Sequence, residues 1–241
     1  MDNIKRICLW SGPRNISTAL MYAFAQRTDT KVFDEPLYAY YLRHHPYAKG
    51  YHPGAEDIIK TMESNGEKVV EVMLRNTEKP VLFFKQMTHH LLDLERSFMK
   101  DTINIILTRD PLDMLPSFDK VIHNFTIDDV GYQLHIDLLN YFESQSIPFK
   151  VINSKQVLKN PEDTLSKLCE FADIPFKKSM LSWKPQKREE DGIWAKYWYH
   201  NIHKSSGFQE YKPKTEAFPA HLNTLLEQCL PHYNRLMEYA I

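Results

Sequence analysis

The sequence has few of the features that would assign it to several large classes of protein. Its 241 residues include only three cysteines and seven glycines, and its formal net charge is −1. The cysteines, Cys8, Cys169 and Cys229, are far apart and lie within apolar segments, so neither a zinc site with paired ligands nor a disulfide framework is indicated. We interpret them as reduced core thiols. Because the charges balance, no basic field indicates a nucleic-acid partner, and any anion must bind locally.

Long apolar runs are also missing. No stretch approaches the roughly 18 consecutive apolar residues of a membrane span, and the start of the chain lacks the apolar core of a secretory signal. These absences lead us to expect no membrane span and a cytoplasmic location. Hydrophobic residues make up 43% and charged residues 25%, which are globular values, and the length suits one sizeable domain over residues 1–241. Nothing in the sequence indicates the oligomeric state.

The stretch over residues 11–18, Ser-Gly-Pro-Arg-Asn-Ile-Ser-Thr, lies between an apolar run and an amphipathic segment. The apolar run predicts a short buried strand, and the apolar spacing after the stretch predicts a helix. Gly12 and Pro13 suit a tight turn between the two. The hydroxyls of Ser17 and Thr18 then fall in the first turn of the helix, where backbone N–H groups lack partners and the helix dipole favours an anion.

Arg14 supports the interpretation of this turn as a phosphate site, because a guanidinium is a permanent cation whose donors match phosphate geometry. The alternative is an ordinary helix start, in which Asn15 or Ser17 caps a backbone donor. The stretch is not a Walker A loop, since no Gly-Lys-Ser/Thr ending follows. An ATPase or GTPase is therefore disfavoured.

Beyond this stretch, predicted strands and helices alternate along the chain. We expect strands over 30–33, 81–85, 103–108 and 149–152. We expect two short helices within 56–76, a helix over 91–98, one over 112–121 interrupted by Pro116, a long one over 128–146, one from 161, and one over 215–240 that Pro231 breaks or bends. The alternation predicts the α/β class, with a mostly parallel central sheet flanked by helices on both faces.

Polar residues gather where the predicted strands end. Glu35 follows the second strand, Lys85 ends the third, and His89 comes shortly after it. Arg109 follows the fourth strand, and Ser117 stands eight positions later, which makes a second pair suited to phosphate. Ligands of α/β sheets bind beyond the carboxyl ends of the strands, so we expect these groups to share a site.

Two further segments are distinctive but less specific. Residues 37–54 are rich in tyrosine and histidine, which fits either an acceptor-binding wall or a structural loop held by aromatic packing. A metal site from these histidines is weakly indicated, since the spacing of the ligands is not convincing. Residues 184–214 are loop-rich. Their Ser205-Ser206-Gly207 run is by itself more typical of a turn than of a site.

In combination, these motifs resemble the sulfotransferases that use 3′-phosphoadenosine 5′-phosphosulfate. In that family a strand-loop-helix cradles the 5′-phosphosulfate, and an Arg with a Ser eight residues later holds the 3′-phosphate. The local form is most similar to the sulfotransferase-like proteins of bacteria and plants, although Ile16 stands where a glycine usually precedes the two hydroxyls. The resemblance implies a P-loop-type nucleotide-binding architecture in which the donor is bound by Gly12, Pro13, Arg14, Asn15, Ile16, Ser17, Thr18, Arg109 and Ser117.

The resemblance also implies the catalytic groups. Glu35 stands where carbohydrate sulfotransferases have their general base, and His89 follows Lys85 in an arrangement similar to that of the cytosolic branch, where a His is the base. An insertion between Lys85 and Thr88 separates the two patterns, so both bases stay open, and a helix-cap role remains the alternative for His89. Lys85, with the guanidinium in the first loop, would stabilise charge on the leaving phosphate.

Two further expectations follow from the resemblance. Residues 184–214 would close over the nucleotide, with Ser205, Ser206 and Gly207 touching it, although the family's fuller Arg-Lys-Gly pattern is missing. The reaction would move a sulfuryl group to a hydroxyl or an amine of a small-molecule or carbohydrate acceptor, without a metal. Two alternatives remain: a P-loop kinase or nucleotide hydrolase, and a catalytically silent nucleotide-binding protein with the same fold.

Overall fold

A five-stranded parallel sheet forms the centre of the protein. The computed structural model describes residues 4–123 and 125–241. The sheet has the order β2-β3-β1-β4-β5, and its strands are β1 (Lys5–Ser11), β2 (Thr30–Asp34), β3 (Val81–Met87), β4 (Ile103–Thr108) and β5 (Phe149–Asn153). The expected fold class is confirmed. Strand β3, at an inner position of the sheet, is buried at all seven of its positions because both faces of the sheet are covered.

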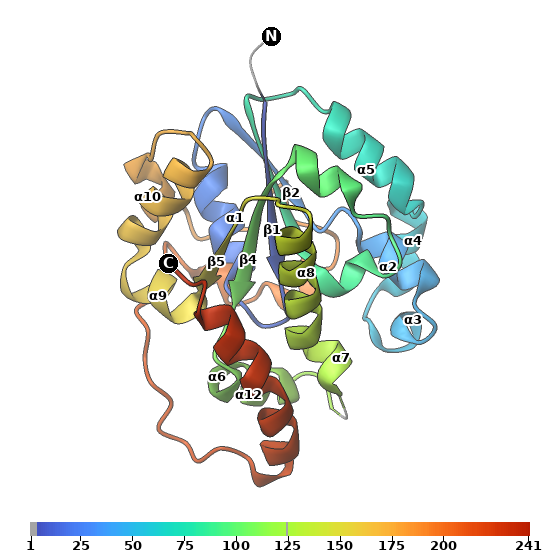
Figure 1. Ribbon diagram of the computed structural model, residues 1–241, viewed down its shortest axis with the longest axis vertical. Helices are drawn as coiled ribbons and strands as arrows, with labels where there is room; N and C mark the ends of the chain where they lie inside the picture. The colour runs from blue at the N-terminus through green and yellow to red at the C-terminus, as the bar shows by residue number, and fades with distance from the viewer. Residues whose placement is uncertain (1–3, 124) are drawn as a thin grey trace.

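Helices cover the two faces of the sheet (Figure 1). One face packs against α1 (Ser17–Ala25), α9 (Ser154–Lys159) and α10 (Pro161–Phe171), and the other against α5 (Gly66–Arg75) and α8 (Tyr132–Ser144). The side chains of β1 alternate accordingly: Ile7 and Leu9 belong to the first core, and Cys8 and Trp10 to the second. This alternation is the two-residue period of a strand.

Two smaller cores lie beside the main ones. The first joins α2 (Tyr38–His44), α3 (Ala48–Tyr51) and α4 (Ala55–Thr61) to α11 (Ala195–Trp198). The second joins α6 (Pro111–Asp119) and α7 (Ile127–Val130) to α12 (Asn223–Met237). The tyrosine- and histidine-rich segment is thus partly helical, and residues from the loop-rich segment pack against it.

Two helix predictions are wrong. Residues 91–98 form no α-helix. Leu91 ends one 3-10 turn, Thr88–Leu91, Phe98 belongs to a second, Ser97–Asp101, and Leu94 lies in the irregular backbone between them; all three side chains are buried. The apolar spacing correctly predicted which side chains are buried, but it did not predict their backbone conformation. The expected helix over 128–146 is divided into α7 and α8 by Gly131, whose φ of +79° is left-handed.

Pro116, which was expected to interrupt a helix, and Pro231, which was expected to break or bend one, both lie inside helices. Pro116 is within α6 and Pro231 is within α12. A proline removes the bond to the carbonyl four residues earlier, and those residues, Leu112 and Glu227, are both exposed. Water can therefore hydrate the freed carbonyls. Helix α12 is also shorter than the expected 215–240.

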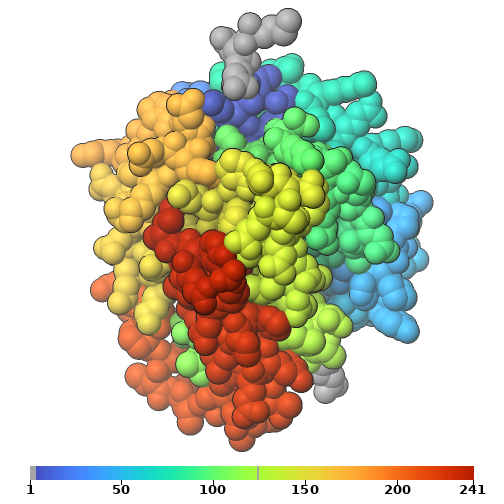
Figure 2. Space-filling model, in the orientation of Figure 1, coloured from blue at the N-terminus to red at the C-terminus, as the bar shows by residue number. Residues whose placement is uncertain are grey.

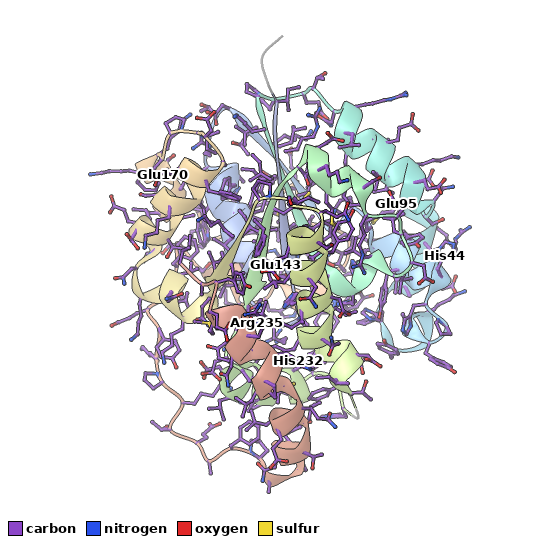
Figure 3. All side chains as sticks on the ribbon, in the orientation of Figure 1. His44, Glu95, Glu143, Glu170, His232 and Arg235 are labelled. Atoms are coloured by element: carbon purple, nitrogen blue, oxygen red, sulfur yellow. The ribbon has the colours of Figure 1, made fainter. Side chains whose placement is uncertain are left out.

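The C-terminal helix lies against α8 on the face shown in Figure 2. Leu236 of α12 is fully buried there. At the surface, Tyr239 donates a hydrogen bond of 2.5 Å to Glu143 of α8 and accepts one of 2.7 Å from Arg235; Glu143 and Arg235 are labelled in Figure 3. These contacts fix the end of the chain near α8.

Two sequence-level expectations have structural counterparts. The three cysteines are buried and unpaired, as expected of core thiols. Among the helices of the described residues, none is both long and apolar enough to span a bilayer.

Candidate active site

A cavity of about 550 Å³ lies at the carboxyl ends of the strands. The turn after β1 and the first residues of α1 line it, together with Glu35 after β2, residues 88–90 after β3, and Arg109 after β4. The parallel sheet brings these segments together because all its strands end at the same edge. The structure therefore joins the motifs that the sequence placed at separate strand ends.

The turn after β1 is held from several sides. A Cβ on Gly12 would lie only 2.9 Å from the carbonyl oxygen of Val130, so the turn requires glycine there. Asn15 donates a hydrogen bond of 3.1 Å to the Leu107 carbonyl and accepts one of 2.6 Å from the Ser154 hydroxyl. Asn15 thus ties the turn to the segments around β4 and β5.

Helix α1 begins without a side-chain cap. Its N-cap residue is Ile16, and neither Asn15 nor Ser17 caps it. The alternative of an ordinary capped start is therefore wrong. No side chain caps the backbone N–H groups at this helix start, where Ser17 and Thr18 line the cavity. An uncapped helix N-terminus is suited to an anion.

The unusual residue of the turn, Ile16, does not line the cavity. Its side chain is half-buried and packs against the hydrophobic core on the α1 face of the sheet. The isoleucine therefore anchors the turn and leaves the cavity side of the loop open.

Two guanidinium groups meet at this edge. Arg14 donates to the Ser117 hydroxyl at 3.3 Å, and Arg109 donates to the Arg14 carbonyl at 2.6 Å. Within residues 4–123 and 125–241, neither arginine belongs to an ion pair. Burial, followed by the neighbouring Arg109 charge, lowers the pKa of Arg14. Two partly desolvated cations side by side have the charge and the donors that suit an anion.

The structure brings the two expected phosphate motifs into contact, since Arg14 from the first reaches Ser117 of the second. Arg14 also has a φ of +54°, in the left-handed region that costs a non-glycine residue about 1–3 kcal/mol. Backbone strain of this kind gathers at functional sites.

A buried group of four side chains, which we call the acid–base cluster, reaches the same cavity through three of its members, Glu35, Lys85 and Tyr199. It comprises Asp34, Glu35, Lys85 and Tyr199. The Lys85 ammonium lies 2.8 Å from Asp34 Oδ1, 2.5 Å from Glu35 Oε1 and 2.6 Å from the Tyr199 hydroxyl. Asp34 and Lys85 are register partners on neighbouring strands β2 and β3. Pairing of the strands thus assembles the ion pair.

The two carboxylates of the cluster have different environments. Asp34 accepts bonds from Lys85, from the Tyr199 hydroxyl at 2.8 Å and from the Gly192 backbone N–H at 3.0 Å. The only hydrogen bond that Glu35 accepts through its side chain, among the described residues, comes from Lys85. One cation serves two carboxylates, so the less well bonded Glu35 is the one that can hold a proton.

The pKa shifts follow from this arrangement. Burial would lower the pKa of Lys85, but the charges of Asp34 and Glu35 raise it well above its ordinary value, so Lys85 stays protonated. Burial raises the pKa of Glu35; Lys85 opposes this rise, and Asp34 adds to it. Glu35 also has a left-handed φ of +48°. A carboxyl with a raised pKa suits a general base near neutral pH.

His89 lies on the cavity, but its environment is unlike that of an imidazole base. Burial, with a smaller contribution from His52, lowers the pKa of His89 to about 3. Its neighbour His90 is buried and stacks between Tyr38 and Tyr41, with ring centroids 4.7 and 4.8 Å away. Both histidines are therefore neutral at physiological pH. Neither sits in a helix cap, since residues 88–91 form a 3-10 turn.

The structure divides the loop-rich segment 184–214 into two parts. Its residues Trp194, Trp198 and Tyr199 line the cavity. Ser205, Ser206 and Gly207 do not. They contact the segment around Trp183 instead. The indole N–H of Trp183 donates to the Ser205 hydroxyl at 3.1 Å, and its backbone N–H donates to the Ser206 carbonyl at 3.0 Å. Gly207 forms an isolated β-bridge with Ser182.

Within the part of the chain that the structure describes, no group of three or more histidine, cysteine, aspartate or glutamate residues is arranged to hold a metal ion. The histidines of residues 37–54 instead pack on aromatic rings. His52 accepts or donates a 2.6 Å hydrogen bond with the Tyr38 hydroxyl, and His45 packs on Tyr41 with ring centroids 5.1 Å apart.

Comparison with known proteins relates the whole chain to one family. A family model described as a sulfotransferase domain matches residues 5–240. Among solved structures, the sulfotransferase domain from the Synechococcus PCC 7002 olefin synthase has a TM-score of 0.61 at 14% identity and covers 95% of each chain. The sulfotransferase domain from the curacin biosynthetic pathway has a TM-score of 0.54 at 17% identity, with 93% of this chain and 97% of that chain covered.

Two curated relatives come from Arabidopsis thaliana. They are named branched-chain-amino-acid aminotransferase-like protein 2 and protein 1, and they are 39% and 40% identical over 229 and 233 residues. The matches cover 94% and 95% of this chain but only 40% and 41% of the relatives. The chain therefore spans about two fifths of the length of these relatives.

Proposed function

The protein belongs to the sulfotransferase domain family, and on that premise we propose that it transfers a sulfuryl group from 3′-phosphoadenosine 5′-phosphosulfate to a hydroxyl or amine of a small-molecule or carbohydrate acceptor. One observation carries the proposal. A pair of guanidinium groups without carboxylate partners in the described structure faces the same cavity as a buried Lys85–Glu35 pair. The guanidinium pair suits the binding of phosphate. In the second pair, Glu35 suits proton transfer and Lys85 suits the stabilisation of negative charge.

The donor would be bound at the first turn and at α6. The uncapped N-terminus of α1, with the hydroxyls of Ser17 and Thr18, would hold the 5′-phosphosulfate. Arg109 and Ser117 would hold the 3′-phosphate, with Arg14 between the two sites because it already contacts Ser117. Segment 184–214 would close over the nucleotide, since residues of this segment line the cavity. Contact of the nucleotide with Ser205, Ser206 and Gly207 stays a prediction.

The reaction requires an in-line transfer. Glu35 would take the proton from the acceptor hydroxyl while the oxygen of that hydroxyl forms the new bond to sulfur. The bond between sulfur and the bridging oxygen of the donor breaks, and that oxygen keeps the electron pair. Lys85 and Arg14 would stabilise the negative charge that develops on the leaving phosphate, which is where preorganised cations contribute most. Glu35 suits the base better than His89, whose pKa burial lowers to about 3.

The aminotransferase part of the relatives' names is not carried over to this chain. The chain matches about two fifths of each relative, and the family model over this segment is that of a sulfotransferase. These names belong to longer proteins, of which this chain matches about two fifths.

Turnover tests the proposal directly. The protein is incubated with 3′-phosphoadenosine 5′-phosphosulfate and a panel of alcohols, phenols, amines and sugars, and the products are screened by mass spectrometry for an added SO₃ group. We expect transfer to at least one acceptor class, with loss of transfer in Lys85→Met. If the nucleotide binds but no acceptor is modified, the protein is a silent nucleotide-binding member of the family.

A further inference from the structure

One wall of the cavity is made of aromatic side chains, which we call the aromatic wall: Tyr38, Tyr41, Tyr51, Trp194 and Trp198. Tyr38 and Trp194 meet edge to face with their ring centroids 5.0 Å apart. The hydroxyls of Tyr41 and Tyr51 are 3.2 Å apart and share a hydrogen bond. The wall is therefore a packed surface whose rings hold one another in place.

The aromatic wall adjoins the proposed general base. The Nε2 atom of His90 lies 4.0 Å from Oε2 of Glu35, and the His90 ring stacks on both Tyr38 and Tyr41. An acceptor that presents its hydroxyl to Glu35 would thus place its remaining atoms against these rings.

Three of the histidines beside the wall, His52, His89 and His90, add no positive charge. Burial, with a smaller contribution from His45, lowers the pKa of His52 to about 4. The pKa of His89 is lowered to about 3 and that of His90 falls well below its ordinary value, in both cases mainly through burial. At neutral pH these rings extend the aromatic surface as uncharged groups.

A carboxylate lies at the edge of this surface. Asp129 of α7 lines the cavity, and its Oδ2 accepts bonds from the Thr126 N–H at 2.7 Å and hydroxyl at 2.9 Å. No ion pair among the described residues includes Asp129 or the adjacent Asp128, which also lines the cavity. Burial first, and then the charge of Asp129, raise the pKa of Tyr51, in keeping with a carboxylate beside that ring.

The positively charged side chains that line the cavity contact groups other than the aromatic wall. Lys85 is engaged by the acid–base cluster. Arg96 holds its guanidinium 5.9 Å from the ring centroid of Tyr141. Tyr141 lies seven residues along α8 from the cavity-lining Leu134, about 10 Å farther along the helix axis. The remaining two, Arg14 and Arg109, are the pair suited to an anion that is described above.

From this arrangement we infer that the acceptor carries a positively charged ammonium group, held against the aromatic wall near Asp129 while its hydroxyl meets Glu35. The faces of tyrosine and tryptophan rings attract ammonium ions through their quadrupoles, and several rings together form the known type of cage for quaternary ammonium groups. Asp129 adds attraction from its edge. The inference rests on the proposed function, since it describes the acceptor of that reaction.

Binding of an ammonium alcohol can be measured without turnover. Choline is titrated into the protein saturated with 3′-phosphoadenosine 5′-phosphate and followed by calorimetry, with 3,3-dimethyl-1-butanol as its uncharged isostere. We expect choline to bind about 10-fold more tightly than the isostere, because only the charge differs. Equal affinities, or a preference for the isostere, a phenol or a neutral sugar, would overturn the inference.

A matched pair of variants locates the effect. Asp129→Asn keeps an acceptor oxygen for Thr126 but removes the charge, so choline affinity should fall about fivefold while that of the isostere stays the same. Asp163→Asn removes an exposed carboxylate on α10, outside the cavity lining, and should leave both affinities unchanged. An equal loss in both variants would also refute the inference.

The test is separate from that of the proposed function. A protein that modifies neutral alcohols and shows no preference for choline keeps the proposed function and loses this inference. A failure of the proposed function is seen instead in the donor reaction, where no acceptor of any charge gains SO₃.

Discussion

Replacing Glu35 with glutamine should separate catalysis from stability at the acid–base cluster. Glutamine keeps the size of the side chain and an acceptor oxygen for Lys85, which lies 2.5 Å from Glu35 Oε1. It cannot take up a proton from an acceptor. Positioned general bases contribute about 10²- to 10⁴-fold, so we expect the kcat of Glu35→Gln to fall by about a thousandfold, with the affinity for 3′-phosphoadenosine 5′-phosphate retained.

The same substitution should stabilise the fold at neutral pH. Burial raises the pKa of Glu35 above its ordinary value of 4.5, with Lys85 opposing and Asp34 adding to the rise. A carboxyl whose pKa is higher in the folded than in the unfolded state gives stability below the unfolded value and loses it as the pH rises through the folded value. Once ionised, as a general base must be, Glu35 therefore weakens the fold, and glutamine removes that cost.

Thermal unfolding between pH 4 and pH 8, together with turnover, measures both effects. We expect the Tm of Glu35→Gln to exceed that of the wild type at pH 7, by about 2–4 °C for each kcal/mol gained in a chain of this size. The difference should disappear toward pH 4, where the wild-type carboxyl is protonated. Full activity in the variant would show that Glu35 is not the base, and a lower Tm at pH 7 would refute the argument from burial.

Three other substitutions test separate parts of the site. Arg109→Ala should weaken binding of the 3′-phosphorylated nucleotide by about 10- to 100-fold in calorimetry, the size of a lost charge-assisted bond, and should hardly change binding of 5′-AMP; an equal loss for both would be inconsistent with a 3′-phosphate contact. His89→Asn should retain most of the turnover, because a histidine whose pKa is about 3 is a weak base, and a thousandfold loss would reverse our choice of base. Tyr199→Phe removes a hydroxyl that bonds Lys85 and Asp34, so urea denaturation should show a loss of about 1.5–3 kcal/mol; unchanged stability would mean that the hydroxyl does not support the cluster.

Much of the fold could be predicted from the sequence because the strands of a parallel sheet covered on both faces are rich in apolar residues. All five strands were recognised, together with the polar residues at their ends. Strand ends share one edge in such a sheet, which is why Glu35, Lys85 and Arg109 could be assigned to one site without knowledge of the strand order. The structure confirms that they line one cavity.

Contacts between distant segments could not be predicted. The pairing of β2 with β3 sets Asp34 opposite Lys85, and nothing in either segment alone specifies that pairing. Tyr199 is 114 residues from Lys85 in sequence, yet it completes the cluster. Its segment was recognised only as aromatic and loop-like. The available signal was a group of tyrosines and tryptophans too apolar for an exposed linker.

Short local structures were the other weak point. Residues 91–98 have the apolar spacing of a helix, but Leu92 has a φ of +43°, and the segment buries its apolar residues from 3-10 turns. Helix α9 has six residues and starts directly after β5, so its pattern is too short to be distinguished from a loop. Over segments of six to eight residues, the spacing of apolar residues predicts which side chains are buried better than it predicts the backbone conformation.

The affinity for the donor nucleotide tests the central claim most directly. The protein is titrated by calorimetry with 3′-phosphoadenosine 5′-phosphate and, separately, with 5′-AMP, which differs only in lacking the 3′-phosphate. A site formed by Arg14, Arg109 and Ser117 predicts that the 3′-phosphorylated nucleotide binds at least about 10-fold more tightly. Equal affinities for the two nucleotides would contradict the assignment of this cavity to the sulfuryl donor.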